Sequence, residues 1–119
     1  MEAYQVSQQI EKKIKLLEAS RDKLKEYGDK KAKAMADYEK TLALTLVKLR
    51  NNAIPEYETF DTNNLPVSLI EKTAKGMCYN EQLEANKADM GYKSLVIYIQ
   101  TVSAEMNALQ SINRHLSET

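Results

Sequence analysis

The sequence predicts an all-α fold: a long antiparallel helical hairpin, similar to a coiled coil, that pairs with a second copy into a four-helix bundle. Apolar residues recur at alternating steps of four and three on both sides of one central segment, which is the spacing of a coiled-coil seam. Glycine occurs three times and proline twice in 119 residues. Both prolines lie in the central segment, so the chain has one major break. A second apolar stripe in the C-terminal half predicts the pairing.

A first helix is expected over about residues 3–51. Twelve positions there follow the four–three spacing and eight of them are apolar, so they form one stripe along a helix. Gly28 leaves an alternative open, in which the helix ends at Gly28 and Asp29 and a shorter bundle results. The twelve seam positions are Ile10, Ile14, Leu17, Arg21, Leu24, Gly28, Lys31, Met35, Tyr38, Leu42, Thr45 and Leu49.

The connection over about residues 52–66 is expected to be a loop, because both prolines and an Asn-Asn pair lie in it and a second Asn-Asn pair, at 51–52, lies at its start. Tyr57 and Phe60 lie in this loop among acidic residues. Two interpretations stay open for their rings. Either the rings close the end of the hairpin core, or they form an acidic and aromatic contact for a partner protein.

A second helix is expected over about residues 67–116, and Ser68 and Glu71 fit a capping box at its start. Two helices of about 45 to 50 residues would each be roughly 70 Å long. Such a length is typical of coiled coils. The seam of the second helix consists of Ile70, Ala74, Met77, Glu81, Ala85, Ala88, Tyr92, Leu95, Ile99, Val102, Met106, Leu109, Asn113 and Leu116.

Folding the chain back at the loop sets pairs of residues at the same level of the two helices. Gly28 then meets Gly91, which would let the two backbones approach closely. Lys31 falls near Glu81 and Glu84. We interpret the polar residues in the middle of the seam as fixing its register at some cost in stability.

A second apolar stripe on the second helix points away from this seam, with small residues Ser94, Thr101 and Ala108 beside it. The end of the first helix is also apolar over most of its circumference. A single hairpin would leave both patches in water, so a symmetric homodimer is predicted. The alternative is a compact monomer whose chain folds back again at the glycines. The predicted self-association residues are Leu83, Met90, Ile97, Ala104, Leu44 and Val47.

Net charge and cysteine content indicate only broadly which partners and which cellular compartment to expect. Basic and acidic residues number 17 each, so net charge does not indicate a nucleic acid or an acidic substrate as partner. The first 50 residues carry about +4 and the rest about −4, which favours two arms that attract each other. Cys78 is the only cysteine, and no signal peptide or membrane-spanning run is evident. A soluble protein in the reducing cytoplasm, with no membrane partner, is expected.

Catalytic, cofactor-binding and metal-binding residues are not predicted. Cys78 and His115 are the only cysteine and histidine, and the hairpin register sets them far apart, which argues against a nucleophile–base pair. Di-metal bundles use Glu-x-x-His motifs, and the chain has none. Phosphate loops and zinc spacings are also missing. The sequence therefore predicts a protein that is not an enzyme.

Lysine-rich sequence in the first helix offers an alternative function. Nine positive charges lie within 22 residues, but four acids interrupt them and a fifth, Glu11, directly precedes them. An exposed, ion-paired helix is favoured, because phosphate-binding helices usually present unbroken basic faces. The alternative is a nucleic-acid-binding accessory protein of a phage replication or recombination module. Its candidate basic surface comprises Lys12, Lys13, Lys15, Lys23 and Lys30.

Three segments carry a resemblance: residues 34–40 (Ala-Met-Ala-Asp-Tyr-Glu-Lys), 74–78 (Ala-Lys-Gly-Met-Cys) and 92–95 (Tyr-Lys-Ser-Leu). With the acidic loop between the helices, they resemble the small helical proteins encoded by bacteriophages and prophages. The resemblance implies a non-enzymatic accessory protein in the cytoplasm of the host bacterium, with a phage or host protein as a further partner. It transfers no functional residues. The sequence thus favours a self-associating interaction protein.

Overall fold

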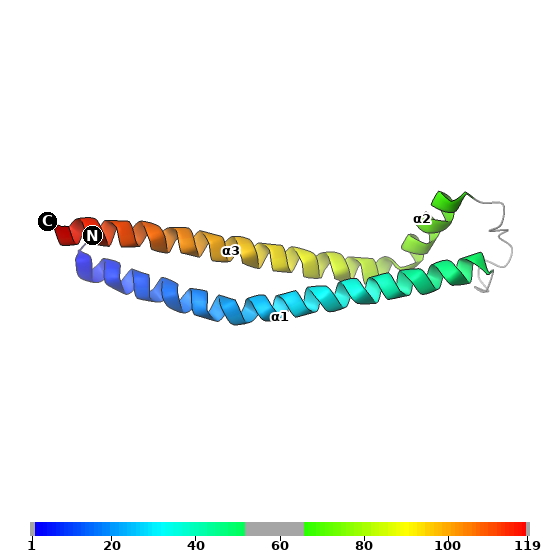
Figure 1. The fold of residues 1–119 in the computed structure, drawn as a ribbon, viewed down its shortest axis with the longest axis horizontal. Helices are drawn as coiled ribbons and strands as arrows, with labels where there is room; N and C mark the ends of the chain where they lie inside the picture. Colours follow the sequence, from blue (N-terminus) through cyan, green and yellow to red (C-terminus); the bar gives the residue numbers. More distant parts are fainter. Residues whose placement is uncertain (1, 52–65, 119) are drawn as a thin grey trace. The chain divides into compact units, whose positions relative to one another are not determined.

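The computed structural model describes residues 2–51 and 66–118, and within them it forms three helices and no strand. These are α1 (Ala3–Arg50), α2 (Val67–Met77) and α3 (Tyr79–Glu118) (Figure 1). The long helices α1 and α3 pack against each other, which confirms the predicted all-α helical hairpin. The chain divides into two compact units, one of residues 1–29 with 90–119 and one of residues 30–89.

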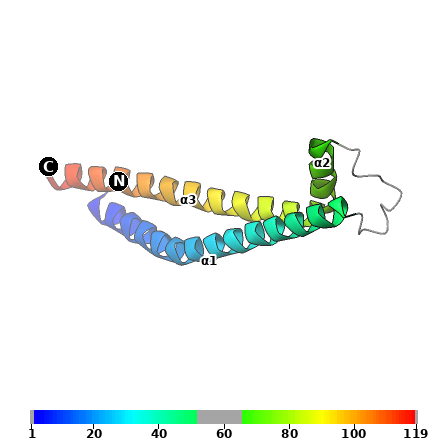
Figure 2. The ribbon, with the colours of Figure 1, turned by 45° about the vertical axis from the view of Figure 1, so that its right-hand side comes forward.

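In the first unit, the N-terminal half of α1 lies beside the C-terminal part of α3 (Figure 2). The two segments run antiparallel, because Lys13 of α1 forms an ion pair with Glu105 of α3, whereas Gly28, later in α1, lies against Tyr92, earlier in α3. Val6 on α1 and Leu95 and Val102 on α3 are buried between them. This burial of apolar side chains along one stripe of each helix stabilises the pair.

In the second unit, α2 packs on the end of α1. Leu49, Ile70 and Ala74 form a buried cluster. Leu42, Leu46 and Met77 pack against it. The helix starts after Pro66, whose fixed φ suits that position. No side chain caps this end, so the predicted capping box of Ser68 and Glu71 is wrong.

The second predicted helix is two helices, separated at Cys78. The backbone of Cys78 leaves the α-helical region (φ −94°, ψ 26°), and its N–H donates to the carbonyls of both Ala74 and Lys75. Its buried Sγ lies 3.4 Å from Thr45 Oγ1 on α1. The seam spacing does not reveal this break, because Ala74, Met77 and Glu81 keep the four–three spacing across it.

The predicted seam of α2 and α3 is confirmed, because all of its positions are buried or half-buried. The predicted seam of α1 is partly wrong, since Ile14, Arg21 and Met35 are exposed. At these levels the residue one position earlier faces α3 instead. Lys13 and Ala34 are half-buried, and Ser20 is only 4% exposed. The seam consists of two rows of positions, each of which repeats every seven residues. The row that starts at Ile10 is correctly placed, so the error lies in the second row, which starts at Ile14. The corrected second row contains Val6, Lys13, Ser20, Tyr27 and Ala34.

Helix α1 continues through Gly28, so the alternative of a helix that ends there is wrong. Gly28 and Gly91 lie at neighbouring levels of the first unit, as predicted, but each faces an aromatic ring. A Cβ placed on Gly28 would lie 3.6 Å from Cε2 of Tyr92, and one on Gly91 would lie 4.0 Å from Cδ2 of Tyr27. Each glycine therefore lies against a tyrosine ring of the other helix, at a distance that would also admit a Cβ.

Candidate interaction surface

An exposed apolar face runs along α3 in the first unit. Its two large side chains are Met90, 68% exposed, and Ile97, 62% exposed. Ala104 recurs seven residues later and is also exposed. Three small exposed residues, Ser94, Thr101 and Ala108, lie between them. We call these six residues the outer face of α3.

The outer face arises because α3 carries two heptad patterns at once. Residues 92, 95, 99, 102, 106 and 109 form the seam against α1. At 3.6 residues per turn, the outer face lies about 150° around the helix from that seam. A helix in a simple hairpin needs only one apolar stripe. The second pattern therefore has no packing role within the described part of the first unit.

The corresponding surface of α1 in the same unit is polar apart from Tyr4 near its start. The residues that point away from α3 there include Gln8, Lys15, Asp22 and Glu26, all exposed. They carry both signs of charge, as on a solvated helix. The contrast shows that the outer face of α3 is a property of that helix and not of the whole unit.

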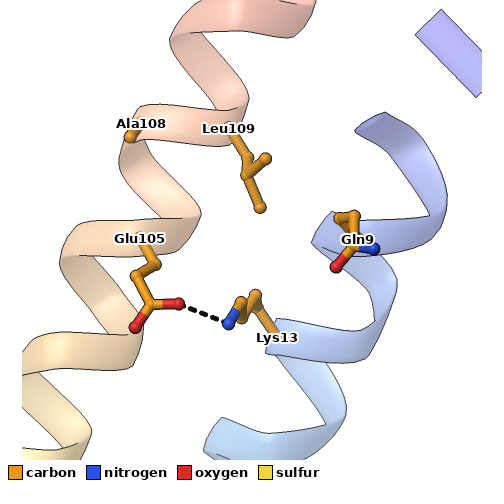
Figure 3. A pocket seen from close by; sticks show the side chains of 5 residues that line it. All are labelled: Gln9, Lys13, Glu105, Ala108 and Leu109. Carbon is orange, nitrogen blue, oxygen red and sulfur yellow. Dashed lines mark hydrogen bonds and ion pairs between the residues drawn. The ribbon is translucent and has the colours of Figure 1, made fainter. Parts of the chain in front are cut away.

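A shallow pocket of about 320 Å³ lies beside this face, lined by Gln9 and Lys13 of α1 and by Glu105, Ala108 and Leu109 of α3 (Figure 3). Its lysine and glutamate pair with each other (Figure 3). The lysine side chain is only 20% exposed. The charges of the pocket are thus neutralised within the chain, and its lining contains no nucleophile.

The second unit holds the remaining predicted self-association residues. Leu83 on α3 and Leu44 and Val47 on α1 are all exposed. Tyr57 and Phe60, the candidate residues for a partner contact, lie outside the described residues. Two exposed residues beside the outer face, Tyr98 and Ile112, were not predicted. Their spacing, two heptads apart along one edge of the stripe, is the signal that could have found them.

The candidate basic surface is exposed at four of its five positions, Lys12, Lys15, Lys23 and Lys30. The fifth is the lysine that pairs with Glu105. Lys31 pairs with Asp89, at 2.9 Å, rather than with the predicted Glu81 or Glu84. The reason is geometric, because Asp89 lies one to two turns nearer the level of Lys31 on α3.

Among residues 2–51 and 66–118, no group of three or more His, Cys, Asp or Glu side chains could hold a metal ion. Cys78 is buried, whereas His115 is exposed. None of the described helices has the length and apolar character needed to cross a membrane.

Comparison with protein-family models, with curated proteins and with solved structures finds no match for the chain. The outer face of α3 is therefore interpreted from its own chemistry.

Proposed function

We propose that the protein is a non-enzymatic helical accessory protein that acts as a homo-oligomer, with a dimer favoured, and presents its hairpins to a partner protein. The observation that supports this proposal is the outer face of α3. Exposed apolar faces of this length commonly mark protein interfaces. A symmetric homodimer is the commonest way to cover such a face.

The energetics of burial favour association through this face. Full burial of a large apolar side chain contributes about 1.5–3 kcal/mol. A symmetric interface counts each such residue twice, once from each copy. Met90 and Ile97 are more than half exposed in the single chain, so most of that contribution is still available for association. The small residues between them would let a second helix approach closely.

Light scattering after size-exclusion chromatography tests the proposal. The wild type is expected to elute with twice the 13.6 kDa mass of the single chain. Ile97→Glu should give the single-chain mass with its helices intact, because it places a charge on the outer face. Ala19→Glu, which adds the same charge on the exposed outer side of α1, should remain a dimer.

Leu95→Glu tests the seam side of α3 independently of its outer face. Leu95 is 9% exposed, so a charge there should unfold the hairpin, with loss of helix signal in circular dichroism. Equal effects of the Leu95 and Ile97 variants would contradict the assignment of two faces. A wild type that is strictly monomeric at micromolar concentration would remove the proposed self-association.

A bacteriophage or prophage origin, with action in the host cytoplasm, is part of the same proposal. It is supported by the resemblance of residues 34–40, 74–78 and 92–95 to small phage helical proteins. Gene neighbourhood tests it, because phage replication or structural genes are expected on both sides of the coding sequence.

Binding of nucleic acid through the lysines of α1 is the alternative. Lys12, Lys15 and Lys23 are exposed, but Glu11 and Asp22 are exposed beside them. Mobility shifts with single- and double-stranded DNA at low salt measure this activity directly. A shift that disappears when the three lysines are changed to glutamine would support the alternative.

A further inference from the structure

The side chains of the outer face of α3 are larger in its N-terminal half than in its C-terminal half. Its N-terminal half carries the large residues Met90 and Ile97, and its C-terminal half carries only Ala104 and Ala108. Packing between helices places large side chains of one helix into spaces left by small ones of the other. The distribution of sizes therefore restricts how a second copy could lie on this face.

A parallel pairing in register would set every residue of the face against itself. Met90 would meet Met90 and Ile97 would meet Ile97, whereas Ala104 would meet Ala104. Large layers would alternate with underfilled ones, and underfilled layers cost stability because cavities forfeit dispersion contacts. The face is poorly suited to this arrangement.

An antiparallel pairing reverses one copy and brings the two halves together. One register then sets Met90 against Ala108, Ile97 against Thr101, and Ser94 against Ala104 of the second copy. Each pair occurs twice because the interface is isologous. Two of the three pairs join a large and a small residue, and the third joins two small ones, so no layer has to hold two large side chains. Charged residues take no part in these layers.

The flanking residues agree with this register. On one side, Lys93 of one copy lies opposite Asn107 of the other, and Gln100 lies opposite itself. On the other side, Glu105 lies opposite Gly91 and is already paired with Lys13 of its own chain. Like charges therefore do not meet across the interface. Beyond these six layers the same two rows of α3 continue with Lys87 opposite Ser111 and Leu83 opposite His115, so the ionisable residues of the rows lie at the two ends of the interface and the six central layers are uncharged.

We infer that the protein forms an antiparallel homodimer in which the outer faces of α3 of two copies pack against each other, with Met90 of one copy against Ala108 of the other. This inference rests on the proposed self-association and adds its direction and register. The two faces of α3 are about 150° apart. In the first unit the helices would therefore follow the order α1, α3, α3, α1, with the two copies of α3 in the centre.

Disulfide trapping tests the direction and the register. Met90→Cys and Ala108→Cys are prepared separately, then mixed and oxidised with copper phenanthroline. The mixture should form a disulfide-linked dimer, since paired layers bring Cα atoms within bonding range. Each variant alone should form none, because two copies of the same position would lie about 27 Å apart along the axis.

Controls and a second pair keep the outcome decisive. Wild type has its only thiol buried at Cys78 and should form no cross-link, and neither should Ala19→Cys on the outer side of α1. Ser94→Cys mixed with Ala104→Cys should repeat the result with smaller changes in side-chain volume. Cross-linking of Met90→Cys or Ser94→Cys to itself would overturn the antiparallel direction.

Light scattering of the same samples separates this inference from the proposed function. Dimers by mass without a cross-link in either mixture would overturn the register while leaving self-association in place. Samples that are monomeric by mass would instead remove both the self-association and the inference that depends on it.

Discussion

Tyr27 with Gly28 on α1 and Gly91 with Tyr92 on α3 form a reciprocal contact, in which each ring faces the glycine of the other helix. Glycine in a helix interior costs about 1 kcal/mol relative to alanine, because it leaves the unfolded backbone freer. A Cβ would lie 3.6 Å from the ring that faces Gly28 and 4.0 Å from the ring that faces Gly91. Both distances are ordinary van der Waals contacts, so each site has room for a methyl group.

Gly28→Ala is expected to raise the free energy of unfolding by about 0.5–1 kcal/mol. The added methyl group would lie at ordinary van der Waals distance from the ring of Tyr92, so the gain in helix propensity is not offset by a clash. Gly76→Ala is the matched control, since a Cβ there meets nothing within 4 Å. Urea unfolding measures both variants. A Gly28→Ala protein that is less stable than wild type would mean that the tyrosine ring needs the glycine.

Sequence reasoning placed the two glycines at one level but not the rings over them. The register follows from the periodic spacing and from the single break in the chain. Which residue fills the space above a glycine depends on the rotation of each helix about its own axis. A seam with two nearly equivalent rows does not determine that rotation to within one residue.

The rotation of α1 about its own axis is also what the sequence did not determine near Ser20 and Arg21. The sequence predicted Arg21 as a seam residue, but Ser20 is buried and donates a hydrogen bond from Oγ to the carbonyl of Leu16 at 2.7 Å. Neither residue is apolar, so hydrophobic spacing could not choose between them. Ser20 is tolerated inside because its hydroxyl is satisfied within its own helix.

Ser20→Glu should lower the free energy of unfolding by about 2–4 kcal/mol, because it places a carboxylate in the apolar contact between α1 and α3. Arg21→Glu, one residue later, should change stability by less than about 0.5 kcal/mol, since its site is exposed. Both changes introduce the same side chain in the same turn of helix. Thermal and urea unfolding report the difference, and a larger loss for the Arg21 variant would restore the seam predicted from sequence.

The break between α2 and α3 depends on tertiary contacts. Ile70 and Ala74 pack with Leu49 at the end of α1, and the thiol of Cys78 lies against Thr45. No proline or helix-ending glycine marks residue 78, and Gly76 lies within α2. Local propensity therefore predicts a continuous helix. The outer face of α3 was predictable, in contrast, because exposure on a long regular helix follows from spacing alone.

Charge on the whole chain does not oppose association of two copies. Acidic and basic residues number 17 each, so long-range repulsion between identical chains is small. The free energy of association would then come from the apolar side chains of the outer face of α3. Contacts of this kind are hardly weakened by moderate salt, unlike contacts between surface charges.

The thermal midpoint of the wild type is expected to rise with protein concentration, because association stabilises the folded chain by mass action. A tenfold increase in concentration is worth about 1.4 kcal/mol per dimer, which shared between two chains of this size corresponds to about 2–4 °C. Ile97→Glu should show one midpoint at all concentrations, whereas Ala19→Glu should follow the wild type. Circular dichroism melts from 1 to 100 µM provide the measurement, which is independent of chromatography. A midpoint of the wild type that does not move over this range would mean that its folded state gains nothing from a second copy.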